Sequence, residues 1–523
     1  MTTRVVLIGY GPVGARFVEE MLPVVRDGIA TLTVLGAERE DTYNRVLLAE
    51  YAVGRATRER LEVSDTRAAR KAGVRISLGT AVRSIDRVRQ CVRTEIGEDI
   101  YYDRLVFATG ARANTPTLAG IERSRHDRTA APTTGERLDA NGAPLPEGII
   151  ALRDLRDAEV ARTSVEAGHR IIVLGAGVLG MEFALAASEQ GASVVVVYHG
   201  DVPMERNLDS GGGRMLAAAA RHAGVTMSSH SRAESVLLST EFGSGSRFNA
   251  LISADGKQLH ADLLVLSCGV AARTELASLS GLRVSSGILV DEELRSWSDP
   301  DVYAIGDCAQ VGRPTEDEAR APGSPAGLIG PGWRQAEWLA ARLTAEVRGF
   351  ERPELLAEER RSVVMLRSEG INVCSGGETG VDPWTADTAL QVSQWVDPAR
   401  GTYAKIVTRN EVLVGFVCAG LPRVAAELTL LFERESEVPI DRTILLRLDS
   451  VSDRSGLRPQ TLDDTVCACN GVSGRAITEA AECGNITVSL VGKATRAGTG
   501  CGGCRERIRE LIESTGTIQV APA

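Results

Sequence analysis

The chain has 523 residues, too many for one hydrophobic core, so roughly three to five domains are expected. Its hydrophobic content of 43% and charged content of 24% are those of an ordinary globular protein. The net charge of −10 comes without a basic block, which argues against a nucleic acid or an anionic membrane surface as partner.

The N-terminal segment runs directly into an apolar, strand-like stretch. It lacks a basic start, a long apolar middle and a small-residue cleavage site, so we expect no signal peptide. No apolar run is long enough to span a bilayer. We therefore expect a cytoplasmic protein, in which crowded cysteines indicate metal or redox chemistry rather than disulfides.

The first predicted unit is a strand, a glycine-rich turn and a helix. Residues 4–14 read RVVLIGYGPVG, in which a β-branched run ends in Gly9-x-Gly11-x-x-Gly14, and a helical pattern follows. Such a turn lets the backbone approach a pyrophosphate, to which the helix N-terminus presents unpaired N–H groups. The next strand ends at Glu38, about where an acid accepts hydrogen bonds from an adenosine ribose. The unit predicts a dinucleotide site.

The same pattern recurs later in the chain. Residues 170–182 read RIIVLGAGVLGME, with Gly175, Gly177 and Gly180 in the same spacing, followed by a helix and a strand. Two such units predict two dinucleotides. The second strand ends in Tyr-His-Gly without the expected acid, and no arginine adjoins it to bind a 2′-phosphate. The sequence leaves NADH and NADPH open and favours NADH slightly.

Two further strands complete an ordered set of motifs. Residues 103–110 read DRLVFATG and residues 301–307 read DVYAIGD. The order of first glycine motif, ATG, second glycine motif and GD resembles that of the pyridine nucleotide–disulfide oxidoreductase superfamily, over roughly residues 1–345. The resemblance implies FAD on the first unit and NAD(P)H on the second, with the nicotinamide stacked on the flavin for hydride transfer.

The resemblance also assigns site residues. Asp307 would bond the ribityl chain, and the helix starting near residues 330–333 would direct its N-terminus at the flavin ring. Glu182 would lie near the nicotinamide, and no separate catalytic residue is expected. The full FAD set is Gly9, Gly11, Gly14, Glu38, Asn44, Arg45, Val82, Thr109, Gly110, Asp307 and Trp333. The NAD(P)H set is Gly175, Gly177, Gly180, Glu182, His199 and Gly269.

The redox cysteine pair of the disulfide reductases is missing from the matching stretch, DTYNRVLLAEYAVG at residues 41–54. Cys308 follows the GD motif and is expected near FAD, but one thiol cannot form a redox disulfide. Electrons must therefore leave the flavin by another route.

Four cysteines near the C-terminus offer that route. They form the pairs Cys467-x-Cys469 and Cys501-x-x-Cys504. Four thiolates can hold zinc or a [2Fe–2S] cluster, and their number does not separate the two, although a C-x-C arm is less common in zinc sites. The pattern C-x-C-N-x-V, a spacer and T-x-x-G-T-G-C-x-x-C resembles the bacterioferritin-associated-ferredoxin-like domain, which implies a [2Fe–2S] cluster.

The expected fold class is α/β: two Rossmann-like dinucleotide-binding domains of glutathione-reductase type, an α/β interface domain and a small helical [2Fe–2S] domain. A polar stretch at residues 119–147 reads as a surface crossover, and the glycine-rich residues 210–214 read as a turn. The expected boundaries are FAD-binding domain 1–147 and 273–350, NAD(P)H-binding domain 148–272, interface domain 355–449, linker 450–463 and [2Fe–2S]-binding domain 464–515.

These parts describe an electron path. A hydride carries two electrons and a [2Fe–2S] cluster accepts one, so a flavin, which exchanges electrons singly or in pairs, belongs between them. The domain order, with YNRVLL at 43–48, PMERNLD at 203–209 and GLIGPGWRQA at 327–336, resembles the N-terminal portion of the large subunit of NAD(P)H-dependent assimilatory nitrite reductase.

The sequence holds no cysteines for the sirohaem and [4Fe–4S] portion of such reductases, which favours the related electron-transfer subunit of assimilatory nitrate reductase. Its partner would be a molybdenum-containing catalytic subunit, and a homodimer is compatible with the sequence. Three alternatives stay open: a nitrite reductase component with a separate sirohaem chain, an NAD(P)H:ferredoxin- or rubredoxin-type reductase, and a non-enzymatic iron or redox sensor.

Overall fold

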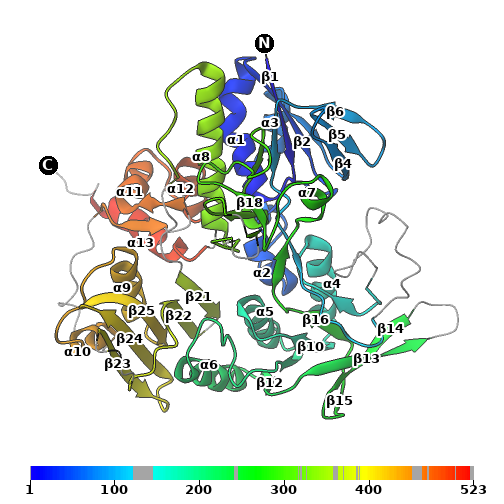
Figure 1. The fold of residues 1–523 in the computed structure, drawn as a ribbon. Helices are drawn as coiled ribbons and strands as arrows, with labels where there is room; N and C mark the ends of the chain where they lie inside the picture. Colours follow the sequence, from blue (N-terminus) through cyan, green and yellow to red (C-terminus); the bar gives the residue numbers. More distant parts are fainter. Residues whose placement is uncertain are drawn as a thin grey trace.

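The computed structural model describes residues 2–121, 145–240, 246–315, 317–318, 321–325, 327–356, 363–368, 370–384, 387, 389–449, 462–467, 470–500 and 502–518 (Figure 1). Most of the predicted crossover at 119–147 and of the linker at 450–463 lies outside these residues. No described helix combines the length and apolar character needed to cross a membrane.

Two five-stranded parallel sheets carry the glycine motifs, and four strands of each, β7-β1-β2-β3 and β16-β10-β11-β12, follow the same order. The first sheet runs β19-β7-β1-β2-β3 and the second runs β9-β16-β10-β11-β12. The first comprises β1 (Thr3–Ile8), β2 (Ala30–Leu35), β3 (Arg75–Ser77), β7 (Arg104–Phe107) and β19 (Val302–Ala304). The second comprises β9 (Ile149–Ile150), β10 (Arg170–Leu174), β11 (Ser193–Val197), β12 (Thr226–Ser228) and β16 (Leu263–Leu266).

The two sheets are interleaved along the chain. The outermost strand of the first sheet, β19, comes after the whole second sheet, and β9 comes before the rest of the second. The chain passes from the first domain to the second and later returns. The strands on these two passages, β8 (Ala111–Ala113) and β17 (Val270–Ala272), pair as an antiparallel ribbon. The predicted fold of two Rossmann-like units is confirmed.

Helices cover the sheets because their apolar residues recur on one face. In α1 (Pro12–Arg26), Phe17, Met21 and Val24 are almost fully buried. α1 lies beside the 20-residue helix α8 (Ile329–Arg348), as Figure 1 shows. The remaining helices of these two domains are α2 (Leu48–Ala52), α3 (Thr66–Lys71), α4 (Leu155–Glu166), α5 (Val178–Glu189), α6 (Ser210–His222) and α7 (Glu275–Leu279).

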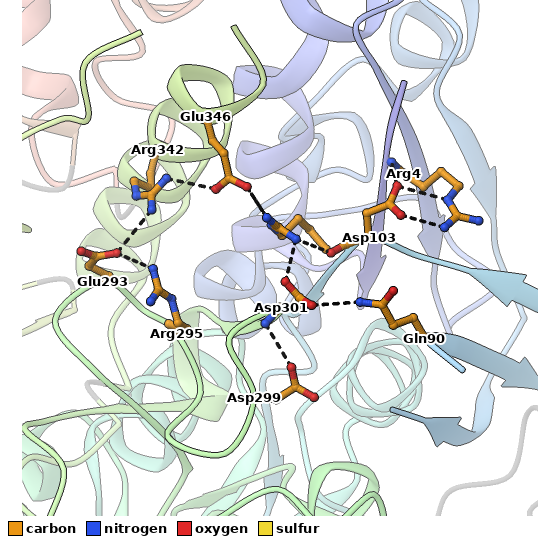
Figure 2. A network of polar contacts seen from close by, with 10 residues as sticks. Arg4, Gln90, Asp103, Glu293, Arg295, Asp299, Asp301, Arg342 and Glu346 are labelled. Atoms are coloured by element: carbon orange, nitrogen blue, oxygen red, sulfur yellow. Dashed lines mark hydrogen bonds and ion pairs between the residues drawn. The ribbon is translucent and has the colours of Figure 1, made fainter. Parts of the chain in front are cut away.

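A network of charged side chains joins α8 to the amino-terminal edge of the first sheet (Figure 2). Arg104, at the start of β7, donates to Asp301 at 2.6 Å and, through Nε, to Glu346 of α8 at 3.0 Å. Arg342 is 2% exposed and pairs with Glu346 at 3.1 Å and with Glu293 at 3.5 Å. These contacts fix the C-terminal part of α8 at the amino-terminal edge of the sheet, so its N-terminal part lies toward the carboxyl ends of the strands, where ligands of such sheets bind.

Smaller sheets extend the two domains. A three-stranded sheet belongs to the first domain and another to the second, and a two-stranded parallel sheet lies near α8. These strands are β4 (Val82–Asp86), β5 (Cys91–Thr94), β6 (Asp99–Tyr101), β13 (Ala233–Thr240), β14 (Ser246–Ser253), β15 (Gln258–His260), β18 (Ile288–Val290) and β20 (Ala309–Val311).

The interface domain is a five-stranded antiparallel sheet of order β21-β22-β25-β24-β23, covered by α9 (Pro422–Glu433). Phe432 of α9 packs edge-on against Phe416, with ring centroids 5.6 Å apart. The strands are β21 (Val363–Ser368), β22 (Ile371–Gly377), β23 (Leu390–Asp397), β24 (Thr402–Arg409) and β25 (Val412–Ala419), and a short helix, α10 (Thr443–Leu446), follows.

The expectation of a turn at residues 210–214 is wrong, because these residues form the first turns of α6. Asp209 caps the helix, accepting from the Gly212 N–H at 3.0 Å. A Cβ at Gly211 would lie 2.5 Å from Tyr403, and one at Gly212 would lie 2.6 Å from Val417. The glycines therefore let the helix approach the interface sheet closely, which offsets their low helix propensity.

The C-terminal module is small and mostly helical, and Figure 1 shows it packed beside α8. Its elements are β26 (Thr465–Cys467), β27 (Val472–Ser473), α11 (Gly474–Glu482), α12 (Val488–Thr495) and α13 (Arg505–Ile518). Its core gathers apolar side chains around two of the cysteines. The predicted fold class, α/β with a small helical C-terminal domain, is confirmed.

Candidate functional site

The two glycine turns have the same construction. The first glycines, Gly9 and Gly175, have φ of +108° and +111°, which strains any residue with a side chain. A Cβ on either would overlap a backbone oxygen of the neighbouring strand end. The third glycines, Gly14 and Gly180, pack against the carbonyl of the first glycine of their own turn. Both turns therefore bring strand and helix together as a dinucleotide fold requires.

The middle glycines face open space. Gly11 and Gly177 are the N-caps of α1 and α5, and a Cβ at Gly177 would meet no atom within 4 Å. At Gly11 the nearest atom would be Nε of Arg45, at 4.0 Å. Each helix N-terminus thus has room above it for an anionic group, which its dipole favours.

One continuous cleft of about 2130 Å³ runs from the first glycine turn to α5 of the second unit. It is larger than the roughly 300–1,000 Å³ of a pocket for one drug-sized ligand, so it has room for more than one cofactor moiety. The predicted residues that border the cleft are Gly9, Gly11, Glu38, Arg45, Val82, Thr109, Gly110, Glu182, Asp307 and Trp333.

Glu38 has partners on both carboxylate oxygens. Tyr43 donates its hydroxyl to Oε2 at 2.8 Å, and the guanidinium of Arg45 pairs with Oε1. Burial raises the pKa of the Glu38 carboxyl, but Arg45 and Tyr43 outweigh it and hold the pKa below its ordinary value. The ionised carboxylate has about four acceptor sites, so it can still accept from a ribose hydroxyl.

Sequence reasoning missed a group of arginines in the cleft. Arg153 pairs with Asp307 at 3.3 Å. Burial and the nearby charge of Arg45 lower the pKa of Arg153. Burial and the same cation also lower the pKa of Arg273, although Glu38 opposes them there. The crowded cations raise the local potential and favour an anionic ligand such as a pyrophosphate. Neither arginine belongs to a spacing motif, so the sequence carries no local signal for them.

The start of α8 closes one end of the cleft. Trp333 donates its indole N–H to the carbonyl of Pro12 at 3.2 Å, and a Cβ at Gly332 would lie 2.6 Å from Val13. The hydroxyl of Thr42 also borders the cleft, and it is buried with no hydrogen-bond partner among the described residues. An unsatisfied buried hydroxyl and a tightly held helix N-terminus fit a polar cofactor that fills the cleft.

Some predicted residues lie elsewhere. Gly14 packs inside the first turn, and Asn44 is 1% exposed and contacts the C-terminal module. Cys308 is fully buried, and burial raises the pKa of its thiol, which suits a small core side chain. The second-unit residues Gly175, Gly177, Gly180, His199 and Gly269 do not border this cleft. Their predicted nucleotide contacts stay predictions.

The C-terminal module brings two of the four predicted ligands into one core. Cys467 ends β26 and is fully buried, and Cys504 precedes α13 and is 8% exposed. Cys469 and Cys501 lie outside the described residues. The side-chain amide of Asn470 approaches Cys467 Sγ at 3.7 Å, and Gly498 and Gly502 have a positive φ, a backbone conformation that favours glycine. Thiolates with amide donors around them suit an iron–sulfur cluster.

The model of the family described as pyridine nucleotide-disulphide oxidoreductase matches residues 3–323. The chain belongs to this family. The model of the BFD-like [2Fe-2S] binding domain matches residues 465–514, so the oxidoreductase carries both parts that its motifs predicted. Both resemblances are confirmed.

Relatives match almost the whole oxidoreductase. It is 26% identical over 516 residues to the NAD(P)H nitrite reductase of Bacillus subtilis (strain 168), covering 98% of this chain and 58% of the relative. It is 26% identical over 510 residues to the assimilatory nitrate reductase electron transfer subunit of the same organism, covering 97% and 59%. The chain thus spans less than two thirds of the length of these relatives.

Among solved structures, putidaredoxin reductase in its covalent complex with putidaredoxin aligns with a TM-score of 0.67 at 22% identity. The alignment covers 85% of this chain and 98% of that chain, a likeness of fold. The two family matches identify an NAD(P)H-dependent oxidoreductase with FAD and a [2Fe–2S] cluster.

Proposed function

We propose that the oxidoreductase is the electron-transfer component of an assimilatory nitrate reductase. It takes electrons from NAD(P)H and passes them, by way of FAD and the cluster, to a separate molybdenum-containing catalytic subunit. The name of the relative in Bacillus subtilis supports the choice of partner. The electron path is supported by a shared wall, since the cluster module borders the same cleft as the first glycine turn, through Asn470, Gly471, Gly502 and Gly503. An electron donor in the cleft and an acceptor in the module would therefore be neighbours.

The cleft residues supply binding and orientation in this proposal. The N-terminus of α1 and the cations Arg45, Arg153 and Arg273 would hold the pyrophosphate, and Glu38 would accept from the ribose. Asp307 would accept from the ribityl chain. When bound, FAD accepts a hydride from NAD(P)H and releases electrons singly.

Glu182 and its neighbours on α5 would border the nicotinamide end. Leu179 and Glu182 reach the cleft from the second unit, so α5 faces the first domain across it. Because the nucleotide on the second unit would begin at the N-terminus of α5, its reactive end would point into this shared space.

A preference for NADH is part of the proposal, and Glu205 supports it. No acid ends β11, but a carboxylate from a later residue lies close to that end of the strand. A Cβ at Gly200 would overlap the carboxylate of Glu205. The adjacent Met204 N–H donates to the Ala176 carbonyl in the second glycine turn, at 2.8 Å, so this loop borders the adenosine end of the unit. A carboxylate there would accept from a ribose hydroxyl and repel a 2′-phosphate.

Service to a nitrite reductase is the second candidate, because the relative with that name is covered to almost the same extent, 58% against 59%. Extracts of host cells that lack this protein distinguish the two. We expect NADH-driven nitrate reduction to be lost, nitrate reduction by reduced viologen, which feeds the catalytic subunit directly, to be kept, and NADH-driven nitrite reduction to be kept. Loss of nitrite reduction alone would establish the second candidate and refute the first.

A further inference from the structure

The cluster module meets the flavin domain through polar contacts, some exposed and some buried. On one side Arg496, which follows α12, reaches three carboxylates of α1 and α8. Its guanidinium lies 3.6 Å from Glu19, 3.0 Å from Glu20 and 3.5 Å from Glu337. These groups are each between 30% and 44% exposed, so solvent and salt screen their attraction. The ion pairs attract the module to this face without fixing its register closely.

Asn44 makes a more specific contact. Its amide nitrogen donates to the carbonyls of Thr499 at 3.0 Å and of Gly500 at 2.9 Å. Its oxygen accepts from the Val46 N–H at 3.0 Å and so fixes the side chain on its own loop. Thr499 and Gly500 directly precede the predicted ligand Cys501. One buried side chain of the flavin domain therefore holds the start of the second cysteine loop.

Arg16 makes the matching contact with the first cysteine loop. It is 6% exposed on α1, and its Nη2 donates to the Asn470 side-chain oxygen at 2.7 Å. Asn470 directly follows Cys469, and its own amide approaches Cys467. The Arg16 guanidinium also stacks on Trp333, 4.8 Å from the ring centroid. The same cation thus joins the cleft wall at α8 to the loop that carries the first cysteine pair.

These bonds select one docked arrangement. A hydrogen bond from a charged donor is roughly twice as strong as one between neutral groups. A module docked in another register would leave the buried Asn44 amide without acceptors, which costs more than its bonds contribute. Arg16 would keep its ion pair with Glu337 at 3.3 Å but would lose the bond from Nη2 to Asn470. Because one contact lies at each cysteine loop, the module cannot pivot about either without losing the other.

We propose that Asn44 and Arg16 are positioning residues that hold both cysteine loops of the cluster module against the cofactor cleft. This inference rests on the proposed electron path. It gives Asn44 a function in addition to the flavin contact expected from the sequence, which stays a prediction. It also gives the asparagine after the first cysteine pair a function as the acceptor for Arg16.

The variants Asn44→Asp and Arg16→Met test the proposal in the holoenzyme. Asn44→Asp keeps the oxygen that accepts from Val46 but removes both donors to the cysteine loop. Asn485→Ala is the matched control. It also removes a hydrogen bond donated by a side-chain amide, in this case to the Ala480 carbonyl at 2.9 Å, but the bond lies inside the module. Two readouts are compared with wild type: hydrogen exchange of residues 465–475 and 496–504 in the oxidised protein, and stopped-flow absorbance after mixing with NADH.

We expect both test variants to exchange faster in these segments and to lower the ratio of the cluster-reduction rate to the flavin-reduction rate, measured in the same protein, roughly tenfold or more. The control should match wild type in both readouts. Unchanged exchange and unchanged cluster reduction in both test variants would overturn the proposal. If the wild-type cluster itself is not reduced by NADH, the proposed function fails instead, and the exchange experiment still decides whether these residues dock the module.

Discussion

Glu19 offers a quantitative test of the contact between α1 and the C-terminal module. The perturbation is Glu19→Gln. Burial raises the pKa of the Glu19 carboxyl to about 7 from 4.5, with Arg16 opposing and the neighbouring carboxylates Glu20 and Glu337 adding to the increase. The shift corresponds to at most about 3 kcal/mol, because each pKa unit is about 1.4 kcal/mol. The side chain keeps 30% of its exposure, so we reduce the expectation to about 1–2 kcal/mol.

The sign follows from proton linkage. The folded protein binds the proton more tightly than the unfolded chain, so this group's stabilising contribution is complete below pH 4.5 and is lost as the pH rises through 7. From pH 5 to pH 8, wild type should therefore lose about 1–2 kcal/mol of unfolding free energy relative to Glu19→Gln. Urea unfolding at several pH values measures the difference. Glu166→Gln, at an exposed pair with Arg162, is the control for removing a surface carboxylate.

A difference between wild type and Glu19→Gln that stays constant with pH would refute this reasoning. So would a difference that favours wild type more strongly at pH 8 than at pH 5. The first result would mean that the carboxyl titrates alike in the folded and unfolded chains, so that its burial carries no free energy. The second would mean that folding lowers the pKa of the carboxyl instead of raising it.

Three further predictions concern separate parts of the chain. Cys501→Ser should abolish cytochrome c reduction by NADH and leave dichlorophenolindophenol reduction, measured by absorbance, because only the first acceptor depends on the cluster. Gly9→Ala should lower flavin content and cost about 1–3 kcal/mol in unfolding free energy, since φ of +108° is strained for alanine; equal flavin content would contradict it. Arg342→Met should cost about 1–3 kcal/mol because it removes a buried cation from Glu346 and Glu293, which keep Arg104 and Arg295 as partners; a midpoint in urea equal to that of wild type would contradict it.

The sequence was sufficient for the parts of this fold that depend on local pattern. Gly9 and Gly175 need a positive φ and a close approach to the next strand, and both demands appear in the sequence as glycine at a fixed spacing after an apolar strand. The order of four such motifs then specified two interleaved domains. The cysteine pairs could also be predicted from local sequence, because metal ligands must lie close together and often occur as closely spaced pairs.

Other features depend on contacts between distant segments, which leave no local pattern. Asn44 bonds with residues more than 450 positions away, and the cations Arg153 and Arg273 meet only after the two domains assemble. The glycines at the start of α6 predict a turn because glycine has a low helix propensity. They are helical because the helix packs closely against the interface sheet, with Tyr403 over Gly211.

Anaerobic titration with NADH, followed by absorbance and electron paramagnetic resonance, tests the central claim most directly. A chain that relays electrons from FAD to a [2Fe–2S] cluster should consume more than about one equivalent of NADH, the two-electron capacity of the flavin, and should show the signal of a reduced cluster. The account would be contradicted if the flavin bleaches fully at about one equivalent of NADH and the four C-terminal cysteines hold zinc or no metal.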